Sequence, residues 1–299
     1  MRMHATRLRR WIGALLGLAA LGVVGVGASP APAAAAGTVP AFNHIFTFVM
    51  ENHSYGQIIG SGSAPYINSL AAKHGLATNY FAVAHPSLPN YLALTGGSTF
   101  GITSDCTTCF VSAPNIAKDR VEASGRSWKA YMESMPRPRF VGDSYPYMQK
   151  HDPFIYFNDI RTNATECNKV VPYSTLATDL KSAGTTPNYA WITPNMCNDM
   201  HDCSVSTGDT WLKNNVPAIL NSAAFTTQNS LLMITWDEDN GSSGNHVATL
   251  VIAKSVPAGF RSSVRYTHYS LLRTVESAWG LSPLTGNDGG ASPMSDFFH

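Results

Sequence analysis

Short apolar runs recur along the chain, and segments whose apolar positions have helical spacing separate them. The clearest runs are rich in β-branched and aromatic residues, span residues 44–50, 188–193 and 230–236, and predict buried strands. Weaker strands are expected at 79–83, 127–132 and 246–253, and helices at 65–75, 90–95, 175–183, 211–220 and 269–279. Strands that alternate with helices predict an α/β fold of three layers, in which helices cover both faces of a largely parallel sheet.

The first 36 residues have the pattern of a secretory signal peptide. Arginines at positions 2, 7, 9 and 10 precede an almost unbroken apolar run from Trp11 to Gly27, and small residues with Ala-x-Ala spacing continue to Ala36. A membrane anchor is the alternative, but the run is marginal for a bilayer span of about 20 apolar residues. We therefore expect cleavage near Ala36 and secretion of residues 37–299 as a single domain, a monomer that is not stably inserted in a membrane.

Removal of this segment changes the sign of the net charge. The full chain has 20 basic and 19 acidic residues and a formal charge of +1, whereas residues 37–299 keep 16 basic and 19 acidic residues, a net charge of −3. A hydrophobic content of 44% excludes a disordered chain. The charge balance argues against a nucleic-acid partner, because nucleic-acid binders carry a basic surface.

The five cysteines all follow residue 100. In an exported protein they predict disulfides, and their odd number leaves one thiol over. Cys197 is close enough to Cys203 for a local bridge, and Cys106 and Cys109 are the candidate partners of Cys167. A zinc site at Cys106-x-x-Cys109 is the alternative, but the second pair of ligands that such a site needs is missing at the expected distance.

Polar residues follow the predicted strands at the point where each strand ends. Glu51-Asn52 follows the first strand, residues 195–202 follow the strand that ends at Thr193, and residues 237–239 follow the strand that ends at Trp236. In a parallel sheet these ends meet at one edge, where acidic groups repel one another unless a cation lies between them. Each segment alone is more typical of a solvated turn, but together they predict a site for a hard divalent cation.

Ser87 is the candidate nucleophile. It lies between the strand predicted at 79–83 and the helix predicted at 90–95, where free helix amides favour a phosphate and an ionised hydroxyl. The alternative is that Ser87 only caps the helix. The chain has no Gly-x-Ser-x-Gly elbow, no P-loop and no His-Glu-x-x-His motif, which disfavours three other classes of enzyme.

Five motifs in fixed order carry a resemblance to a known family. They are Met50-Glu51-Asn52-His53-Ser54-Tyr55, His85-Pro86-Ser87-Leu88-Pro89-Asn90-Tyr91, Lys150-His151-Asp152-Pro153-Phe154, Asn198-Asp199-Met200-His201-Asp202 and Trp236-Asp237-Glu238-Asp239-Asn240-Gly241. Over about residues 40–285 the chain resembles the bacterial phosphoesterases, secreted acid phosphatases and phospholipases C of the alkaline phosphatase superfamily. It is most similar to the small secreted acid phosphatases of mycobacteria, because Asn245 replaces an aspartate of the larger phospholipases and their long C-terminal extensions are missing.

The resemblance implies an alkaline-phosphatase-like fold and a metal-assisted acid phosphatase that acts on phosphate monoesters, such as phosphoinositides or other small organic phosphates. It implies one divalent metal ion, Mg, Ca, Mn or Zn, held by Glu51, Asn52, Ser87, Asp237 and Glu238. It implies catalytic roles for Ser87, His201, His85 and Asp199. It implies substrate binding by Asn90, His151 and His246.

These assignments predict a mechanism through a phosphoserine. Ser87 attacks phosphorus, a protonated His201 gives its proton to the leaving oxygen, and water then hydrolyses the intermediate. Because an ordinary imidazole is protonated in acid, we expect an acidic pH optimum. The alternatives are a phospholipase C or other phosphodiesterase with the same side chains, and a cation-binding domain without catalysis.

Overall fold

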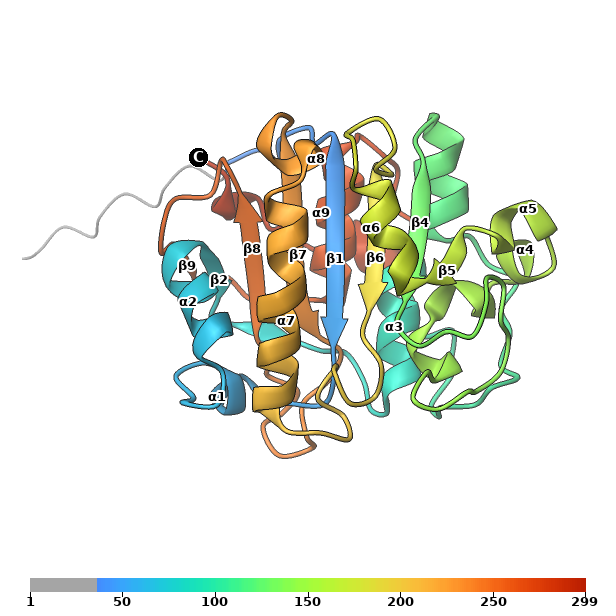
Figure 1. Ribbon diagram of the computed structural model, residues 1–299, viewed down its shortest axis with the longest axis horizontal. Coiled ribbons are helices and arrows are strands. Elements are labelled where there is room, and N and C mark those ends of the chain that lie inside the picture. Colours follow the sequence, from blue (N-terminus) through green and yellow to red (C-terminus); the bar gives the residue numbers. More distant parts are fainter. Residues whose placement is uncertain (1–36) are drawn as a thin grey trace, which may run out of the picture. The chain divides into compact units, whose positions relative to one another are not determined.

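The computed structural model describes residues 37–299, so the predicted signal peptide lies outside the described part of the chain. An eight-stranded sheet forms the centre (Figure 1). Across the sheet the strands are β5 (Val170–Pro172), β4 (Trp128–Met132), β6 (Tyr189–Thr193), β1 (His44–Met50), β7 (Ser230–Trp236), β8 (Thr249–Ala253), β2 (Gly75–Ala77) and β9 (Arg261–Ser262).

The sheet is largely parallel, as the alternation of strands and helices predicts. β1 pairs in parallel with β6 on one side and with β7 on the other, and β4 and β5 continue the parallel part. β8 is antiparallel to both β7 and β2. The chain returns from β7 to β8 through residues 237–248 without a helix, and a connection of this kind reverses the direction of the strand.

Helices cover both faces of the sheet (Figure 1). On one face lies the long helix α7 (Val205–Leu220), which packs on α2 (Pro65–Lys73); on the other, α3 (Ser87–Gly96) packs on α9 (His268–Ala278). The remaining helices are short: α1 (Tyr55–Ile58), α4 (Asn158–Arg161), α5 (Ala164–Cys167), α6 (Leu176–Asp179), α8 (Ala223–Thr226) and α10 (Gly286–Gly289). The three-layer α/β prediction is confirmed.

Several boundaries differ from the sequence prediction. The strand expected at 79–83 is only β3 (Tyr80–Phe81), and it pairs with β10 (Tyr266–Thr267) in a separate small sheet rather than in the main one. The helix expected at 211–220 begins at Val205, because the Ser204 side chain accepts a hydrogen bond from the Thr207 amide and caps it. The segment between residues 99 and 165, whose apolar residues show only weak periodicity, holds β4 and several short helical turns.

Two disulfides are present in the described residues. The predicted Cys197–Cys203 bridge is confirmed, but Cys106 is bonded to Cys109, and Cys167 is a free, buried thiol. The predicted pairing of Cys167 is therefore wrong. Cys106 and Cys109 lie three residues apart in one loop, and the two oxidised sulfurs are not free to hold zinc.

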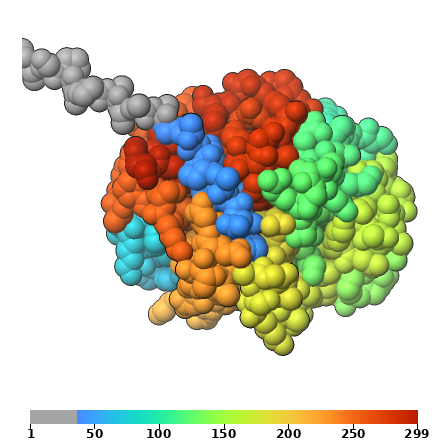
Figure 2. All heavy atoms as spheres, turned by 90° about the horizontal axis from the view of Figure 1, so that it is seen from above, coloured from blue at the N-terminus to red at the C-terminus, as the bar shows by residue number. Residues whose placement is uncertain are grey.

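The strands are almost completely buried, and the two ends of the described chain pack against the same edge. β1 and β7 are buried at every position, which is typical of central parallel strands. At the edge where β1 begins, the Phe42 and Phe298 rings lie 5.5 Å apart, and the Trp279 indole donates to the Phe42 carbonyl at 2.7 Å. Figure 2 views the molecule from this side, with the first described residues in blue. Over residues 37–299, no helix combines the length and hydrophobicity that a bilayer span requires.

Candidate active site

The carboxyl ends of the three central strands meet at the opposite edge of the sheet. Glu51 directly follows β1, and its amide donates to the Asp199 carbonyl in the loop after β6 at 2.8 Å. Asp237 directly follows β7, and its amide donates to the Met50 carbonyl at 2.9 Å. The Asn52 amide donates to Asp237 Oδ1 at 3.2 Å, with Asn52 in the left-handed region at a φ of 58°. Backbone hydrogen bonds therefore hold three acidic segments together, as the strand-end pattern predicts.

A buried histidine connects the small sheet to this edge. His268, at the start of α9, donates from Nε2 to the Asp237 carbonyl at 2.6 Å and accepts at Nδ1 from the Tyr80 hydroxyl at 3.0 Å. Burial lowers the pKa of His268 to about 4, so the imidazole is neutral near pH 7. β3 thus supports the site indirectly, although it does not belong to the main sheet.

Ser87 is the first residue of α3, and its side chain does not cap that helix. Pro86 occupies the cap position, and no side chain bonds the first turn from there. The Ser87 hydroxyl instead donates to Glu51 Oε2 at 3.1 Å and lies 3.4 Å from Glu238 Oε1. Both the Ser87 and Glu51 side chains are buried. The alternative that Ser87 only caps the helix does not fit this geometry.

Asn90 holds the turn that presents Ser87. Its Oδ1 accepts hydrogen bonds from the Val83 and Ala84 amides, both at 3.0 Å. Its Nδ2 donates to the Ala84 carbonyl at 2.8 Å and to the Pro86 carbonyl at 3.3 Å. Because backbone groups of its own turn occupy both ends of the amide, the Asn90 side chain fixes the turn before α3 in this structure.

Glu51 lies at the centre of a buried polar group. The Tyr91 hydroxyl donates a hydrogen bond to Glu51 Oε1. His151 stands between two carboxylates, with Nε2 3.3 Å from Glu51 Oε2 and Nδ1 3.4 Å from Asp199 Oδ2. One ligand atom from each of Glu51, His151 and Asp199 lies within 4.8 Å of the others, and all three residues are buried.

The acidic groups of the site repel one another in a medium of low dielectric constant. Burial, followed by the charges of Asp237 and Asp199, raises the pKa of Glu51 well above its ordinary value. Burial and the neighbouring Glu238 raise the pKa of Asp237 to about 8, and burial and the charge of Asp105 raise that of Glu238 to about 7. Burial also raises the pKa of Asp199. Without a cation, several of these carboxyl groups would hold protons near neutral pH.

The donor set fits a divalent cation. Asp237 Oδ2 is buried without a hydrogen-bond partner among the described residues. Burial also lowers the pKa of His151, so its imidazole is neutral and has one N–H for the two carboxylates beside it. A cation would satisfy these unpaired oxygens and offset the repulsion. Oxygen ligands suit Mg²⁺, Ca²⁺ and Mn²⁺, whereas an imidazole among them also suits Zn²⁺.

The metal ligands that the family resemblance implies overlap the group of Glu51, His151 and Asp199 without matching it. Glu51 belongs to both, whereas His151 and Asp199 carried substrate-binding and catalytic assignments. Asp237 and Glu238 lie beside Ser87 and Glu51 at the same edge. Asn52 reaches the edge through its backbone amide.

Two further histidines line the site. His85 has its Nδ1 2.6 Å from Glu238 Oε2 and its Nε2 3.4 Å from Asp239 Oδ1, and its side chain is 45% exposed. His201 has its Nδ1 2.7 Å from Asp202 Oδ1, and its backbone amide donates to Asp199 Oδ1 at 2.7 Å. Both imidazoles are partly exposed, so an incoming substrate has access to them.

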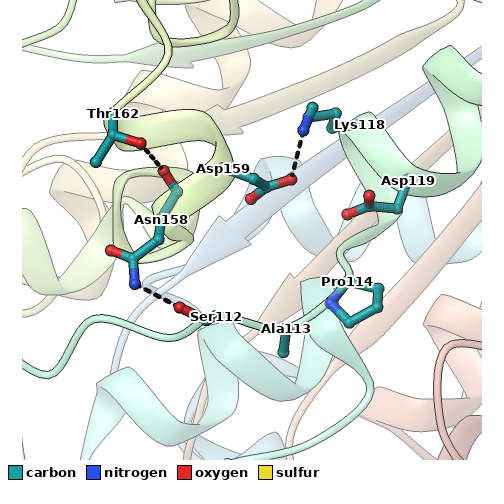
Figure 3. A pocket seen from close by; sticks show the side chains of 8 residues that line it. All are labelled: Ser112, Ala113, Pro114, Lys118, Asp119, Asn158, Asp159 and Thr162. Carbon is teal, nitrogen blue, oxygen red and sulfur yellow. Dashed lines mark hydrogen bonds and ion pairs between the residues drawn. The ribbon is translucent and has the colours of Figure 1, made fainter.

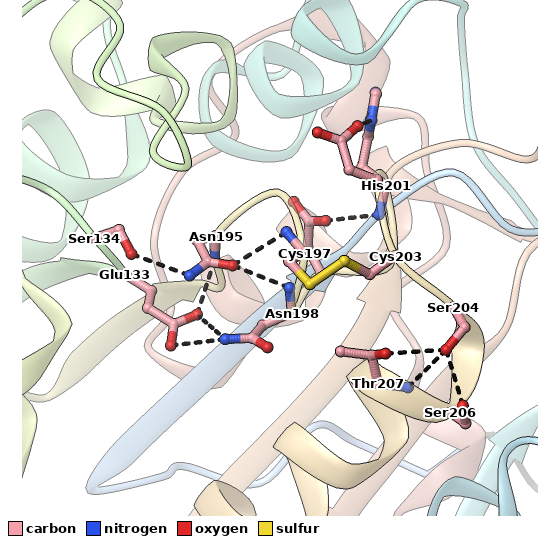
Figure 4. The surroundings of a disulfide bond; sticks show 12 residues. Glu133, Ser134, Asn195, Cys197, Asn198, His201, Cys203, Ser204, Ser206 and Thr207 are labelled. Carbon is pink, nitrogen blue, oxygen red and sulfur yellow. Dashed lines mark hydrogen bonds and ion pairs between the residues drawn. A yellow bond between two sulfur atoms is a disulfide. The ribbon is translucent and has the colours of Figure 1, made fainter.

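The Cys197–Cys203 disulfide closes the loop that carries Asp199 and His201 (Figure 4). Glu133 anchors the start of this loop, because its carboxylate accepts from the Asn195 amide at 2.9 Å and from the Asn198 side chain at 3.0 Å. The loop is therefore fixed both covalently and by hydrogen bonds.

His246, another predicted site residue, has its contacts away from the acidic groups. Its ring is stacked between Tyr55 and Phe81, with centroid distances of 4.5 and 5.0 Å, and its Nε2 lies 3.0 Å from the Thr78 carbonyl. Conversely, three residues without a predicted role have contacts in the site: Tyr91, Asp105 and Lys150. Tyr91 and Lys150 occur within the quoted motifs, which was the only signal for them in the sequence.

Two surface hollows differ in their relation to the site. A hollow of about 510 Å³ opens beside His85, lined by residues 82–85 together with Gly241, Gly244 and Asn245. Another, of about 420 Å³, is lined by Ser112, Asn158, Lys118 and Asp159, among others (Figure 3). None of the residues that line this second hollow belongs to the acidic segments at the strand ends. Lys118 Nζ already pairs with Asp159 Oδ2 at 3.2 Å. The hollow beside His85 therefore adjoins the candidate active site, whereas the hollow beside Lys118 does not.

Comparison with known proteins supports the family suggested by the five motifs. Residues 61–282 match the model of the Phosphoesterase family. The chain is 38% identical over 278 residues to the phosphatidylinositol-3-phosphatase of Mycobacterium tuberculosis, with 91% of this chain and 88% of that protein covered. It is 31% identical to an acid phosphatase of Aspergillus fumigatus over 84% of this chain, which spans only 58% of the fungal enzyme. The predicted enzyme class, a phosphoric monoester hydrolase, is the class that these names denote.

Solved structures with little sequence similarity share the fold. A Vibrio parahaemolyticus protein of the alkaline phosphatase superfamily matches with a TM-score of 0.59 at 13% identity, with 84% of this chain and 71% of that chain covered. The phosphonate monoester hydrolase of Agrobacterium radiobacter matches with a TM-score of 0.55 at 13% identity, with 86% and 77% covered. The chain thus belongs to the Phosphoesterase family and has the fold of the alkaline phosphatase superfamily.

Proposed function

We propose that this protein is a secreted, metal-assisted acid phosphatase that hydrolyses phosphate monoesters through a phosphoserine at Ser87. The observation that carries the proposal is the position of the Ser87 hydroxyl at the first turn of α3, 3.1 Å from Glu51 and 3.4 Å from Glu238. In this position the hydroxyl of a nucleophile has a carboxylate beside it as a proton acceptor.

The first half of the proposed reaction transfers the phosphoryl group to Ser87. The Ser87 hydroxyl donates to Glu51 Oε2, so its proton has an acceptor as Oγ attacks phosphorus. The bond from phosphorus to the ester oxygen breaks, and that oxygen takes a proton from His201, whose Nδ1 lies 2.7 Å from Asp202 Oδ1. The product alcohol then leaves.

The second half regenerates the enzyme. Water attacks phosphorus, the bond from phosphorus to Ser87 Oγ breaks, and His201 takes a proton from the attacking water as Ser87 recovers its own. His85, whose Nδ1 lies 2.6 Å from Glu238 Oε2, lines the hollow beside the site. A cation held by Glu51, Asp237, Glu238 and their neighbours would supply positive charge to the phosphoryl oxygens and lower the pKa of the nucleophile when bound.

A direct test compares a monoester with a diester. We expect turnover of p-nitrophenyl phosphate to exceed turnover of bis-p-nitrophenyl phosphate and of phosphatidylcholine by at least about 100-fold in kcat/KM. A preference for either diester would assign the same side chains to a phosphodiesterase or phospholipase C. Absence of turnover of all three, with retained cation binding, would favour a cation-binding domain without catalysis.

The proposed substrate class is taken from the mycobacterial relative, because its alignment covers most of both chains. The name of the mycobacterial relative denotes a phosphatase of a phosphoinositide, and the two chains align over most of both lengths. We extend this class, a monoester on a polyol headgroup, to the present protein. Short-chain phosphatidylinositol 3-phosphate, assayed beside its 4- and 5-phosphate isomers and glycerol phosphate, tests the extension. Equal kcat/KM for all four would indicate a general acid phosphatase.

Export, cleavage near Ala36 and a monomeric state also belong to the proposal. Their support is the basic, apolar and small-residue order of residues 1–36, together with two disulfides in the described part. N-terminal sequencing of protein from the culture medium, and its mass by light scattering, test these points. A start at Met1, or a stable dimer, would contradict them.

A further inference from the structure

Lys150 has a defined position in the site and no role in the mechanism given above. It lies in the turn Gln149–His151, directly before His151, and its side chain is 14% exposed. Its Nζ donates to Asp105 Oδ2 at 3.0 Å and lies 3.5 Å from His201 Nε2. The ammonium group therefore stands between a carboxylate and the imidazole that the mechanism uses.

Asp105 connects this ammonium group to the nucleophile. While Oδ2 binds Lys150, Oδ1 accepts a hydrogen bond from the Leu88 amide at 3.0 Å. Leu88 follows Ser87 in the first turn of α3. One carboxylate thus fixes both the start of the nucleophile helix and the position of Lys150 Nζ, because each of its oxygens accepts one charge-assisted hydrogen bond.

The charges around Lys150 support its place among the acidic groups. Burial raises the pKa values of Glu51, Asp199 and Glu238, whereas the positive charge of Lys150 lowers each of these pKa values. Burial alone would lower the pKa of Lys150, but Asp105 and the nearby Glu51 keep it above its ordinary value. The side chain is therefore cationic at the pH of any acid phosphatase.

We propose that Lys150 binds a phosphoryl oxygen of the substrate and that Asp105 is its positioning residue. This inference rests on the proposed function. Lys150 Nζ lies 3.5 Å from His201 Nε2, so a phosphoryl oxygen that binds this ammonium group lies beside the imidazole that protonates the leaving oxygen.

The test measures phosphate binding beside turnover. Lys150→Met should lower kcat/KM for p-nitrophenyl phosphate by about 10²–10³-fold, the usual effect of losing one aligned electrostatic donor. Its inhibition constant for inorganic phosphate should rise at least about 10-fold, whereas Lys150→Arg should recover part of both losses. Lys129→Met is the matched control, because Lys129 pairs with Asp179 at 2.7 Å between β4 and α6, and both parameters should stay unchanged.

Substitution of Asp105 distinguishes a role in positioning Lys150 from general support of the fold. Asp105→Asn keeps an oxygen for the Leu88 amide but removes the charge that holds Lys150, so it should weaken phosphate binding by itself. In the Lys150→Met background it should have little further effect, because the two residues act as one unit. Additive effects of the two substitutions would overturn the positioning role. This arm also tests the proposal if Lys150→Met does not fold.

The outcomes distinguish this inference from the proposed function. If wild-type turnover depends on Ser87 but phosphate inhibition is the same in Lys150→Met, the role of Lys150 is wrong and the proposed function stands. If the wild-type protein hydrolyses no monoester and calorimetry with inorganic phosphate gives no binding, both fail. If inorganic phosphate binds, this binding is weaker in Lys150→Met, and no monoester is hydrolysed, then only the proposed function fails.

Discussion

The Ser87 hydroxyl lies 3.1 Å from Oε2 of Glu51, although the two residues are 36 positions apart in the sequence. Glu51 is fixed where β1 ends, and Ser87 is fixed where α3 begins. Their contact joins the central strand of the sheet to the first turn of a helix that covers one face. A nucleophile placed in this way is held by rigid elements rather than by a loop, which favours precise alignment with phosphorus.

The first prediction concerns Asp237 in protein that has been freed of metal. The pKa of Asp237 is about 8 in the folded state against an ordinary 3.8, so the folded state binds the proton more tightly than the unfolded state. Stability of the metal-free protein should therefore fall as pH rises from about 4 to 8. Asp237→Asn should flatten that dependence and raise the melting temperature at pH 8. Thermal melts after chelation at several pH values measure this.

Added metal should leave the melting temperature of the Asp237→Asn variant unchanged. In the wild-type protein the cation that the site binds, Mg²⁺, Ca²⁺, Mn²⁺ or Zn²⁺, should raise the melting temperature by an amount that grows with the logarithm of its concentration, and activity should return with it. Asp209→Asn is a suitable control, because Asp209 is a buried aspartate that accepts from the Tyr66 and Ile67 amides on α2. A melting temperature that ignores chelation and every cation tested would count against the metal site.

The second prediction decides between two roles for Asn90. The sequence assigned Asn90 to substrate binding, whereas its side chain bonds four backbone groups of the turn before Ser87. Asn90→Ala should destabilise the protein by about 2–4 kcal/mol, because it removes four hydrogen bonds to partly buried backbone groups. It should lower kcat through loss of the Ser87 geometry. Urea unfolding and steady-state kinetics measure both effects. A raised KM with unchanged stability would instead support contact with substrate.

The third prediction lies outside the active site. Glu276 on α9 is fully buried, and burial together with hydrogen bonding to Asp288 raises its pKa to about 8. Because the folded state holds this proton more tightly, Glu276 should make the protein less stable as pH rises from about 4.5 to 8. Glu276→Gln should remove that part of the slope and leave kcat/KM at its wild-type value. Melting temperatures across this pH range provide the measurement, and an unchanged slope in the variant would refute the prediction.

The fourth prediction concerns the pH profile of turnover. With His201 as the acid, kcat should fall toward alkaline pH as the imidazole loses its proton, and His201→Gln should remove that limb and lower kcat by about 10²–10⁴-fold. His53→Gln is a comparison at a partly buried histidine whose Nδ1 lies 3.0 Å from the Glu51 carbonyl. Full activity of the wild-type protein at clearly alkaline pH would contradict the assignment of His201.

The sequence predicted the parts of the fold that depend on local pattern. β1 and β7 follow directly from continuous apolar runs, and the acidic residues after them are recognisable because a strand end places them at the sheet edge. The reversed direction of β8 and the separate pairing of β3 depend on long-range packing. Neither leaves a trace in the apolar pattern of those segments, because parallel and antiparallel buried strands share one pattern.

The contacts of the site were less predictable than its location. His151 reaches Glu51 and Asp199 from a short turn in a segment with weak periodicity, so its spacing gave no hint of them. The predicted disulfide of Cys167 was wrong for a similar reason, because the count of cysteines does not determine their pairing. His246 stacks between two aromatic rings that only the tertiary structure brings beside it.

Trapping of the phosphorylated enzyme tests the central claim most directly. Protein mixed with a ³²P-labelled monoester and quenched in acid within milliseconds should carry acid-stable label on the peptide that contains Ser87, and Ser87→Ala should carry none. The same variant should lose at least about 10⁴-fold in kcat while its melting temperature stays close to that of the wild type. Label on another residue, or wild-type turnover in Ser87→Ala, would contradict the account.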